Sequence, residues 1–206
     1  GTLVAFDGRE VETHFVGRFN VYNLLAVYAA TCLLGQDKEQ TLINMSLLVP
    51  VAGRFQTIYS PQGFVAVVDY AHTPDGLENV LKAAREITPK EGSLICIFGC
   101  GGDRDATKRP KMGKIAEDYA DRVIVTSDNP RSEDPQQIIS DILAGFKSTA
   151  NVIVEPDREL AIKEAKKITT FNDVILIAGK GHEDYQILAH ETIHFDDREK
   201  VKEIFG

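Results

Sequence analysis

The 206-residue sequence predicts an α/β protein with a Rossmann-like, mostly parallel sheet flanked by helices. From residue 54 onward, short apolar runs alternate with polar loops and helical patterns, which is typical of a parallel sheet covered on both faces. The loops after these apolar runs are rich in Gly, Asp, Arg and His, whereas the opposite loops are plain connectors. Ligands of open α/β sheets bind at the carboxyl ends of the strands, so the rich loops indicate a ligand-binding edge.

The first fifty residues follow a different pattern and are expected to form a separate part. The predicted elements are, in order, a strand at 2–6, a turn at Asp7-Gly8, a strand at 11–15, and helices at 20–34 and 38–48. Gly35 is a plausible C′ residue for the first helix. Two strands alone bury no face, so this part suggests the remnant of a larger sheet. We therefore expect two domains, 1–52 and 53–206.

The remaining elements alternate along the chain. Strands are predicted at 64–68, 94–98, 123–125, 152–154, 174–177 and 185–188. Helices are predicted at 74–87, 110–119, 135–146 and 158–168, with a closing helix that ends at 205. Thr73, Asp157 and Asp197 are the expected N-caps of three of these helices, because their side-chain oxygens can accept from the first free backbone amides.

Composition narrows the possible partners and compartments. The net charge is −8 and no Lys/Arg-rich stripe occurs, so we expect no nucleic-acid partner. No apolar run approaches the roughly 18 residues that span a bilayer, and no secretory signal opens the chain, so we expect no membrane insertion. The three cysteines form neither a zinc spacing nor a disulfide framework, which favours a reducing cytoplasm. The first residue is glycine, which suggests a fragment or a processed chain.

The tetrapeptide Asp128-Asn129-Pro130-Arg131 follows a predicted strand and carries the most specific chemistry. Its carboxylate accepts from ammonium groups, its carboxamide donates and accepts, and its guanidinium binds a carboxylate with two donors. Together these groups suit an amino acid. The alternative is an Asx-Pro turn that simply leaves the strand.

Two glycine-rich loops lie at the same predicted edge. One is GCGGDRDATKR at 99–109, in which Arg104, Lys108 and Arg109 could hold anions. The other, at 179–183, contains Glu183, which could meet an ammonium group. Neither is a Walker A loop or a G-x-G-x-x-G fingerprint. Tight turns with a salt-bridged surface remain the alternative for both.

Several other polar residues are candidates with simpler alternatives. Asn20 and Asn23 lie on one face of the first long helix, which one of them could instead cap. Arg54 lies at the proposed boundary, where a cation could reach a ligand held between domains. His72 follows Asp69 by three residues, but two ligands without a third favour a structural role over a metal site.

In combination and in order, these segments resemble the Mur ligases, and most closely those that add the third residue of the peptidoglycan precursor peptide. The resemblance covers essentially the whole chain and rests on GRFNVYNLLA (17–26), GRF (53–55), VDYAHTPDGLENVL (68–81), FGCGGDRD…KRP (98–110), SDNPR (127–131) and AGKGHEDYQ (178–186). The one departure is Ala106-Thr107, where the family often has a glycine before the lysine. The resemblance implies that residues 1–52 are the end of a central ATP-binding domain and that 53–206 are the amino-acid-binding domain.

The same resemblance implies roles for individual residues. Those that match the amino-acid site are Arg104, Asp128, Asn129, Pro130, Arg131, Gly179 and Glu183. Those that match the ATP site at the domain junction are Asn20, Asn23, Arg54, Asp69 and His72. No catalytic residue and no metal ligand is assigned within this chain, and Mg2+ is expected to be held mostly by a domain upstream.

The implied reaction is ATP-dependent amide formation through an acyl phosphate on UDP-N-acetylmuramoyl-L-Ala-D-Glu, by a cytoplasmic monomer. The DNPR motif implies meso-2,6-diaminopimelate as the incoming amino acid, because its second carboxylate would satisfy a buried Arg131. The alternatives are a relative that adds L-lysine or another diamino acid, a non-catalytic amino-acid-binding module, and a folate-polyglutamate or cyanophycin type of ligase. The chain alone is expected to be inactive, because it contains no phosphate-binding loop.

Overall fold

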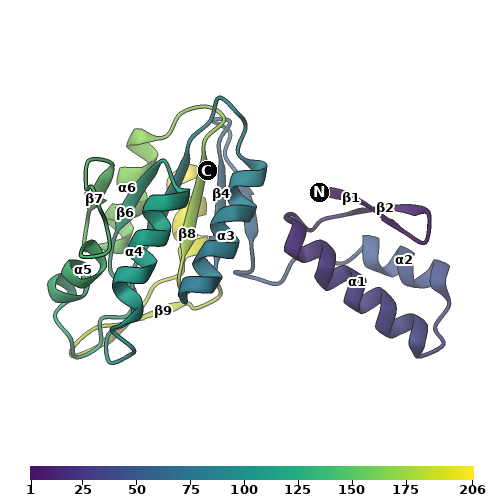
Figure 1. The fold of residues 1–206 in the computed structure, drawn as a ribbon, viewed down its shortest axis with the longest axis horizontal. Coiled ribbons are helices and arrows are strands. Elements are labelled where there is room, and N and C mark those ends of the chain that lie inside the picture. Colours follow the sequence, from purple (N-terminus) through teal and green to yellow (C-terminus); the bar gives the residue numbers. More distant parts are fainter. The chain divides into compact units, whose positions relative to one another are not determined.

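The computed structural model describes residues 1–206 and separates into two compact units. Unit 1 is Gly1–Val51 and unit 2 is Ala52–Gly206 (Figure 1). Each unit has its own hydrophobic core.

Unit 1 combines a β-hairpin with two helices. Its elements are β1 (Thr2–Phe6), β2 (Arg9–Thr13), α1 (Arg18–Leu33) and α2 (Lys38–Ser46). Apolar side chains from all four elements form its core: Phe6, Val11, Leu24, Tyr28, Leu42 and Met45. As predicted, Gly35 is the C′ residue that follows α1, and its φ is 74°. The amides of Gly35 and Gln36 donate to the carbonyls of Cys32 and Thr31, which is a Schellman motif.

Several boundaries in unit 1 differ from the prediction by one or two residues; for example, α2 ends at Ser46 and not at residue 48. The second strand begins at Arg9 instead of residue 11, because Asp7 and Gly8 both have positive φ and form a two-residue turn that pairs Phe6 with Arg9. Helix α1 begins at Arg18, with Gly17 as its N-cap, so neither asparagine caps it.

Unit 2 is built on a six-stranded sheet in the order β3-β4-β8-β5-β6-β7. Its strands are β3 (Gln56–Tyr59), β4 (Val65–Asp69), β5 (Leu94–Phe98), β6 (Arg122–Val125), β7 (Val152–Val154) and β8 (Val174–Ala178). Strand β3 is antiparallel to β4, and the other neighbours are parallel. A separate hairpin consists of β9 (Tyr185–Ile187) and β10 (Thr192–His194).

Helices cover both faces of this sheet, as Figure 1 shows. They are α3 (Pro74–Ile87), α4 (Lys108–Tyr119), α5 (Pro135–Leu143), α6 (Arg158–Ile168) and α7 (Asp197–Phe205). Ile95 and Ile97 of β5 belong to one core cluster with residues of α6 and α7. The alternate residues Leu94, Cys96 and Phe98 are also fully buried, because successive side chains of a strand point to opposite faces and α3 and α4 pack on the other face. The predicted α/β class, with its mostly parallel sheet, is confirmed.

Several features of unit 2 were not predicted or were predicted wrongly. Helix α5 ends at Leu143 and not at residue 146, and α4 begins at Lys108 and not at residue 110. Strand β3 was missed because it is a short edge strand of mixed polarity, and β10 because its three residues are mostly exposed. The N-cap of α7 is Asp196, which accepts from the amide of Arg198, and Asp197 is instead the first helical residue. Asp197 is buried because it pairs with Arg158. The Thr73 and Asp157 caps are as predicted.

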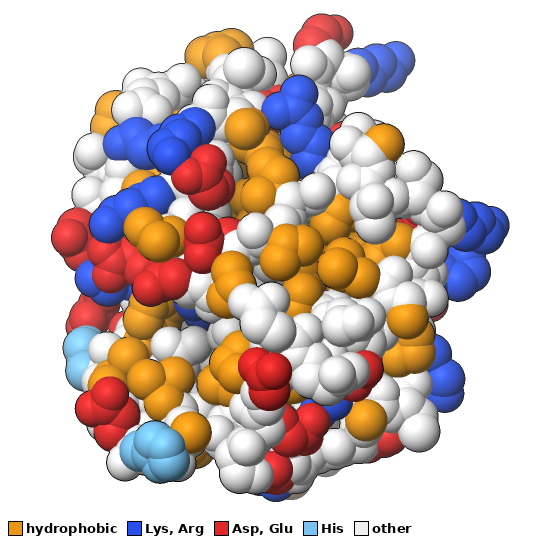
Figure 2. All heavy atoms as spheres, turned by 90° about the vertical axis from the view of Figure 1, so that its left-hand side faces the viewer, with side chains coloured by type: hydrophobic (Ala, Val, Ile, Leu, Met, Phe, Trp, Pro, Cys, Tyr) orange, Lys and Arg blue, Asp and Glu red, His pale blue; other side chains and the backbone are white.

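The surface of unit 2 mixes apolar and charged groups. Figure 2 shows the face that carries β7 and α5, where hydrophobic side chains cross the middle and acidic and basic side chains lie around them. None of the helices in either unit has the length and apolarity needed to cross a membrane.

Candidate functional site

A cavity of about 580 Å³ opens at the carboxyl edge of the parallel strands in unit 2. It is lined by four loops that follow β4, β5, β6 and β8, and by the start of the β9–β10 hairpin. Its charged lining comprises the bases Arg104, Lys108, Lys111 and Arg131 and the acids Asp105, Asp128 and Glu183. A cavity with both signs of charge is suited to a zwitterionic ligand.

The glycine-rich loop after β5 packs directly on the loop after β6. A Cβ at Gly99 would lie 2.2 Å from the carbonyl oxygen of Thr126, and one at Gly102 would lie 1.9 Å from that of Pro130. The amide of Gly102 also donates to the carbonyl of Asn129 at 2.9 Å. These glycines therefore permit close packing of two protein loops, and none of those after β5 has positive φ. Pro130 is buried in this contact.

The side chains of Asp128 and Asn129 are buried and heavily hydrogen-bonded. One oxygen of Asp128 accepts from the amide of Asn129 at 2.7 Å. The carboxamide of Asn129 donates to Glu183 at 3.0 Å and accepts from the amide of Ile187 at 2.9 Å. Asn129 therefore connects the loop after β6 to the loop after β8 and to β9.

Arg131 lines the cavity, and some N–H donors of its guanidinium form no hydrogen bond within the chain. Its Nη1 donates to the carbonyl oxygens of Gly102 and Asn129, at 2.9 and 3.4 Å. Its Nε and Nη2 have no acceptor within the chain, so one edge of the guanidinium is available to a ligand carboxylate. Arg131 is partly exposed, so the expectation of a buried guanidinium was wrong, and its φ of 53° reflects a strained turn.

The loop after β8 brings Glu183 to the cavity beside Gly179. The Glu183 side chain is 16% exposed and accepts from both Asn129 and Lys180. Gly179 has a φ of 119°, and a Cβ there would lie 2.6 Å from a carboxylate oxygen of Asp128. Only glycine fits this position, since any side chain would displace Asp128 and adopt a strained backbone.

A second group of residues surrounds Tyr70, next to the cavity. The guanidinium of Arg54 lies 4.7 Å from the Tyr70 ring centroid, and the rings of His72 and His182 lie at 4.6 and 5.1 Å. Asp69 is buried below them and accepts from the amides of Phe55 and Ala71 at 2.7 and 2.8 Å. Burial raises the pKa of Asp69, against the effect of these two hydrogen bonds and of Arg54.

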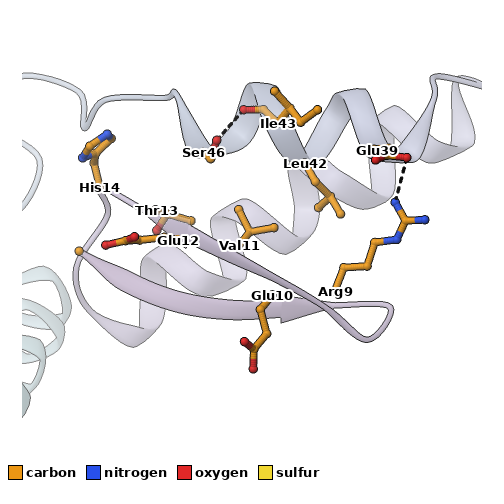
Figure 3. A pocket seen from close by; sticks show the side chains of 11 residues that line it. Arg9, Glu10, Val11, Glu12, Thr13, His14, Glu39, Leu42, Ile43 and Ser46 are labelled. Carbon is orange, nitrogen blue, oxygen red and sulfur yellow. Dashed lines mark hydrogen bonds and ion pairs between the residues drawn. The ribbon is translucent and has the colours of Figure 1, made fainter.

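Asn20 and Asn23 belong to the first turns of α1 in unit 1. The carboxamide nitrogen of Asn20 donates to the carbonyl of Val16 at 2.8 Å. The carboxamide oxygen of Asn20 accepts from the carboxamide nitrogen of Asn23 at 3.3 Å. Unit 1 also has a cavity of its own, of about 550 Å³, between the β1–β2 hairpin and α2 (Figure 3). Arg9 and Glu39 pair across it at 3.5 Å, and none of the predicted site residues lines it.

The comparisons with known proteins agree on one family. A protein-family model described as "Mur ligase, glutamate ligase domain" matches residues 53–181. Over 208 residues the chain is 53% identical to UDP-N-acetylmuramoyl-L-alanyl-D-glutamate–2,6-diaminopimelate ligase of Parabacteroides distasonis, covering 100% of this chain. The chain belongs to the Mur ligase family.

Other relatives extend the similarity. The ligase of the same name from Synechococcus elongatus is 52% identical over 204 residues, covering 98% of this chain and 41% of that protein. A solved structure of a ligase of this name is 40% identical in sequence, with a TM-score of 0.74. The match covers 96% of this chain and 40% of that one. This Mur ligase chain spans 43% of the length of the P. distasonis protein.

The predicted site residues of this Mur ligase chain fall into three groups. Seven of them line one cavity, namely His72, Arg104, Asp128, Asn129, Arg131, Gly179 and Glu183. Pro130, Arg54 and Asp69 lie in unit 2 but do not line it, and Asn20 and Asn23 lie in unit 1. Lys108, which the sequence suggested as an anion contact, also lines the cavity, and the lining residues that the prediction did not name include Tyr70, Lys111 and Tyr185. The sequence feature that could have identified them is their position within or next to the motifs of the family.

The cysteines of this Mur ligase chain yield a test of the cavity wall. Cys100 lines the cavity but is only 2% exposed, and burial raises the pKa of its thiol to about 12, as it does for Cys96. Because the thiolate is the reactive species, iodoacetamide at about pH 8 is expected to label only the partly exposed Cys32 in the native protein. Mass spectrometry should find all three labelled after denaturation. Labelling of Cys100 in the native state would contradict this packing.

Proposed function

We propose that this chain holds meso-2,6-diaminopimelate as the incoming nucleophile of an ATP-dependent ligase that extends UDP-N-acetylmuramoyl-L-alanyl-D-glutamate. The names of the relatives support the substrates. The observation that carries the proposal is that three loops bring two arginines and two acids to the lining of one cavity, namely Arg104, Arg131, Asp128 and Glu183. Diaminopimelate has two carboxylates and two amines, which is the charge pattern that such a lining complements.

In this proposal the guanidinium of Arg131 binds the distal carboxylate, since its Nε and Nη2 are unbonded within the chain. Arg104 is exposed at the cavity and would bind the second carboxylate. Asp128 and Glu183 would accept from an ammonium group. Asn129, Pro130 and Gly179 shape the site through their packing, because the Asn129 carboxamide is already bonded to protein groups.

ATP would bind near Arg54 and His72, which lie against the Tyr70 ring. Asp69 would act indirectly, since both of its oxygens hold backbone amides of the loops that carry Arg54 and His72. Asn20 and Asn23 of unit 1 are proposed as further ATP-binding residues. The structure contains no group of three or more Asp, Glu, His or Cys side chains that could hold a metal ion, and we assign no metal ligand.

The contribution of this chain to the reaction would be positioning. The amine nitrogen attacks the acyl carbon of a phosphorylated D-glutamyl carboxylate, the carbon–oxygen bond to phosphate breaks, and the nitrogen loses a proton. Holding the amine at near-attack distance removes much of the entropic cost of such a step. We also propose that the enzyme is a cytoplasmic monomer, and the three free thiols support the reducing compartment.

The test uses the complete gene product, including any residues encoded before Gly1. Phosphate release from ATP is expected with the UDP-linked dipeptide and meso-diaminopimelate, and much less with L-lysine. The 206-residue chain alone is expected to release none, because it contains no G-x4-G-K-[ST] loop. Equal or better turnover with L-lysine would favour the alternative diamino acid. Amino-acid binding without any turnover by the complete product would favour a non-catalytic binding module.

A further inference from the structure

Lys180 is a fully buried cation directly behind the cavity. Its side chain is 0% exposed, and it does not line the cavity. Its Nζ donates to the carboxylate of Glu183 and to the carboxamide oxygen of Asn129, both at 3.2 Å. Both acceptors line the cavity. The hydrogen bonds of the Lys180 ammonium group therefore go to two residues that line the cavity.

A buried ammonium group is costly unless it is paired, so these two contacts are constrained. Nζ also lies 5.4 Å from the ring centroid of Tyr185, a third side chain at the cavity. The Glu183 carboxylate raises the pKa of the Tyr185 hydroxyl, with burial as the next cause, which reflects how close the negative charge lies. Lys180 thus sits among three cavity side chains and fixes the position of the charged one.

The backbone around Lys180 is held as tightly as its side chain. Gly179 and Gly181 flank it, both with positive φ. A Cβ at Gly181 would lie 2.6 Å from the Cβ of Tyr70 and 2.7 Å from the carbonyl oxygen of Gly53. The loop therefore packs against other segments on both sides of Lys180, which leaves the ammonium group little freedom to move away from Glu183.

We propose that Lys180 is a positioning residue for the amino-acid site. Through its bonds to the Glu183 carboxylate and the Asn129 carboxamide, it holds Glu183 in the orientation that accepts the ammonium group of the incoming diamino acid. This inference rests on the proposed function. Without the cation, the Glu183 carboxylate keeps only one side-chain donor, Asn129, and becomes free to rotate.

Arg158 shows how a buried cation with a purely structural role differs. It is also 0% exposed, but its partners are Asp197 and the backbone carbonyls of Ser127 and Ala178. None of these groups is a cavity side chain. A structural role alone predicts that loss of Lys180 lowers thermal stability and leaves amino-acid recognition unchanged. A positioning role predicts a selective loss of recognition.

The experiment compares Lys180→Met, which has a similar length and no charge, with Glu183→Gln, the double variant and the unsubstituted protein, all as the complete gene product. Lys114→Met, which removes an exposed cation of α4, is the matched control. Lys180→Met is expected to raise the KM and the calorimetric Kd for meso-diaminopimelate by about 10- to 100-fold, with an unchanged KM for ATP. The double variant should lose less than the product of the two single effects, because both act through one carboxylate.

Each outcome decides the inference. An unchanged KM for the amino acid in a folded Lys180→Met protein, or strictly multiplicative effects in the double variant, would overturn it and leave the proposed function intact. If the unsubstituted protein binds no diamino acid, the proposed function fails and this inference fails with it. If circular dichroism shows that Lys180→Met is unfolded, Lys180→Gln, which retains one donor to Glu183 or Asn129, replaces it under the same criteria.

Discussion

Replacement of Arg131 by alanine is expected to abolish the preference for meso-diaminopimelate over L-lysine. The two unbonded donors of the guanidinium would form charge-assisted bonds to a carboxylate that lysine lacks. Loss of such a contact costs about 1.5–3 kcal/mol, or roughly 10- to 150-fold in affinity. Calorimetry with both amino acids on the complete gene product should show this loss for diaminopimelate and little change for lysine.

Two further variants make this result specific. Arg131→Lys keeps the charge but not the planar fork, so an intermediate affinity is expected. Arg85→Ala removes an exposed arginine of α3 that pairs with Asp121, and it should leave both affinities unchanged. An equal loss for diaminopimelate and lysine would show that Arg131 binds the carboxylate that the two ligands share, and would refute its role at the distal end.

Replacement of Asp197 by asparagine is expected to destabilise unit 2 strongly. Asp197 accepts from Nε and Nη2 of Arg158, both at 2.8 Å, and both side chains are 0% exposed. Removal of one charge from a buried pair leaves the other uncompensated, which costs about 3–5 kcal/mol of unfolding free energy. Urea denaturation followed by circular dichroism measures this loss.

The same pair offers a stringent check. The double variant Arg158→Met/Asp197→Leu should be more stable than Asp197→Asn, because it buries no unpaired charge. Asp118→Asn, which breaks the exposed Lys114–Asp118 pair of α4, should leave the unfolding free energy unchanged. An Asp197→Asn protein as stable as the unsubstituted one would show that water reaches the guanidinium and that the pair is not truly buried.

The buried Arg158–Asp197 pair also affects the cavity of unit 2. Arg158 also donates to the carbonyls of Ser127 and Ala178, the residues directly before Asp128 and Gly179. It therefore fixes the points at which two of the cavity loops leave the sheet. The sequence alone identified Arg158 only as the start of a helix, because nothing local indicates that its partner lies 39 residues further along the chain.

Local patterns predicted most of the fold because they are caused locally. The continuous apolar runs of the central strands and the Thr73 and Asp157 caps are properties of a few neighbouring residues. Strand β3 was not predicted, because an edge strand of mixed burial lacks a continuous apolar run. The cap of α7 was misplaced by one residue because Asp196 and Asp197 are both able to cap, and only the buried Arg158 selects between them.

For the site, the sequence by itself determined which loops carry the chemistry and which family the chain resembles, because motif residues and their order are written in the chain. Only the tertiary structure decided which groups each residue contacts. It showed that Asn129 is occupied by protein groups, that the glycines after β5 pack on another loop, and that Lys180 lies buried between two cavity residues. These roles depend on contacts between loops that are distant in sequence, and the packing of the sheet creates those contacts.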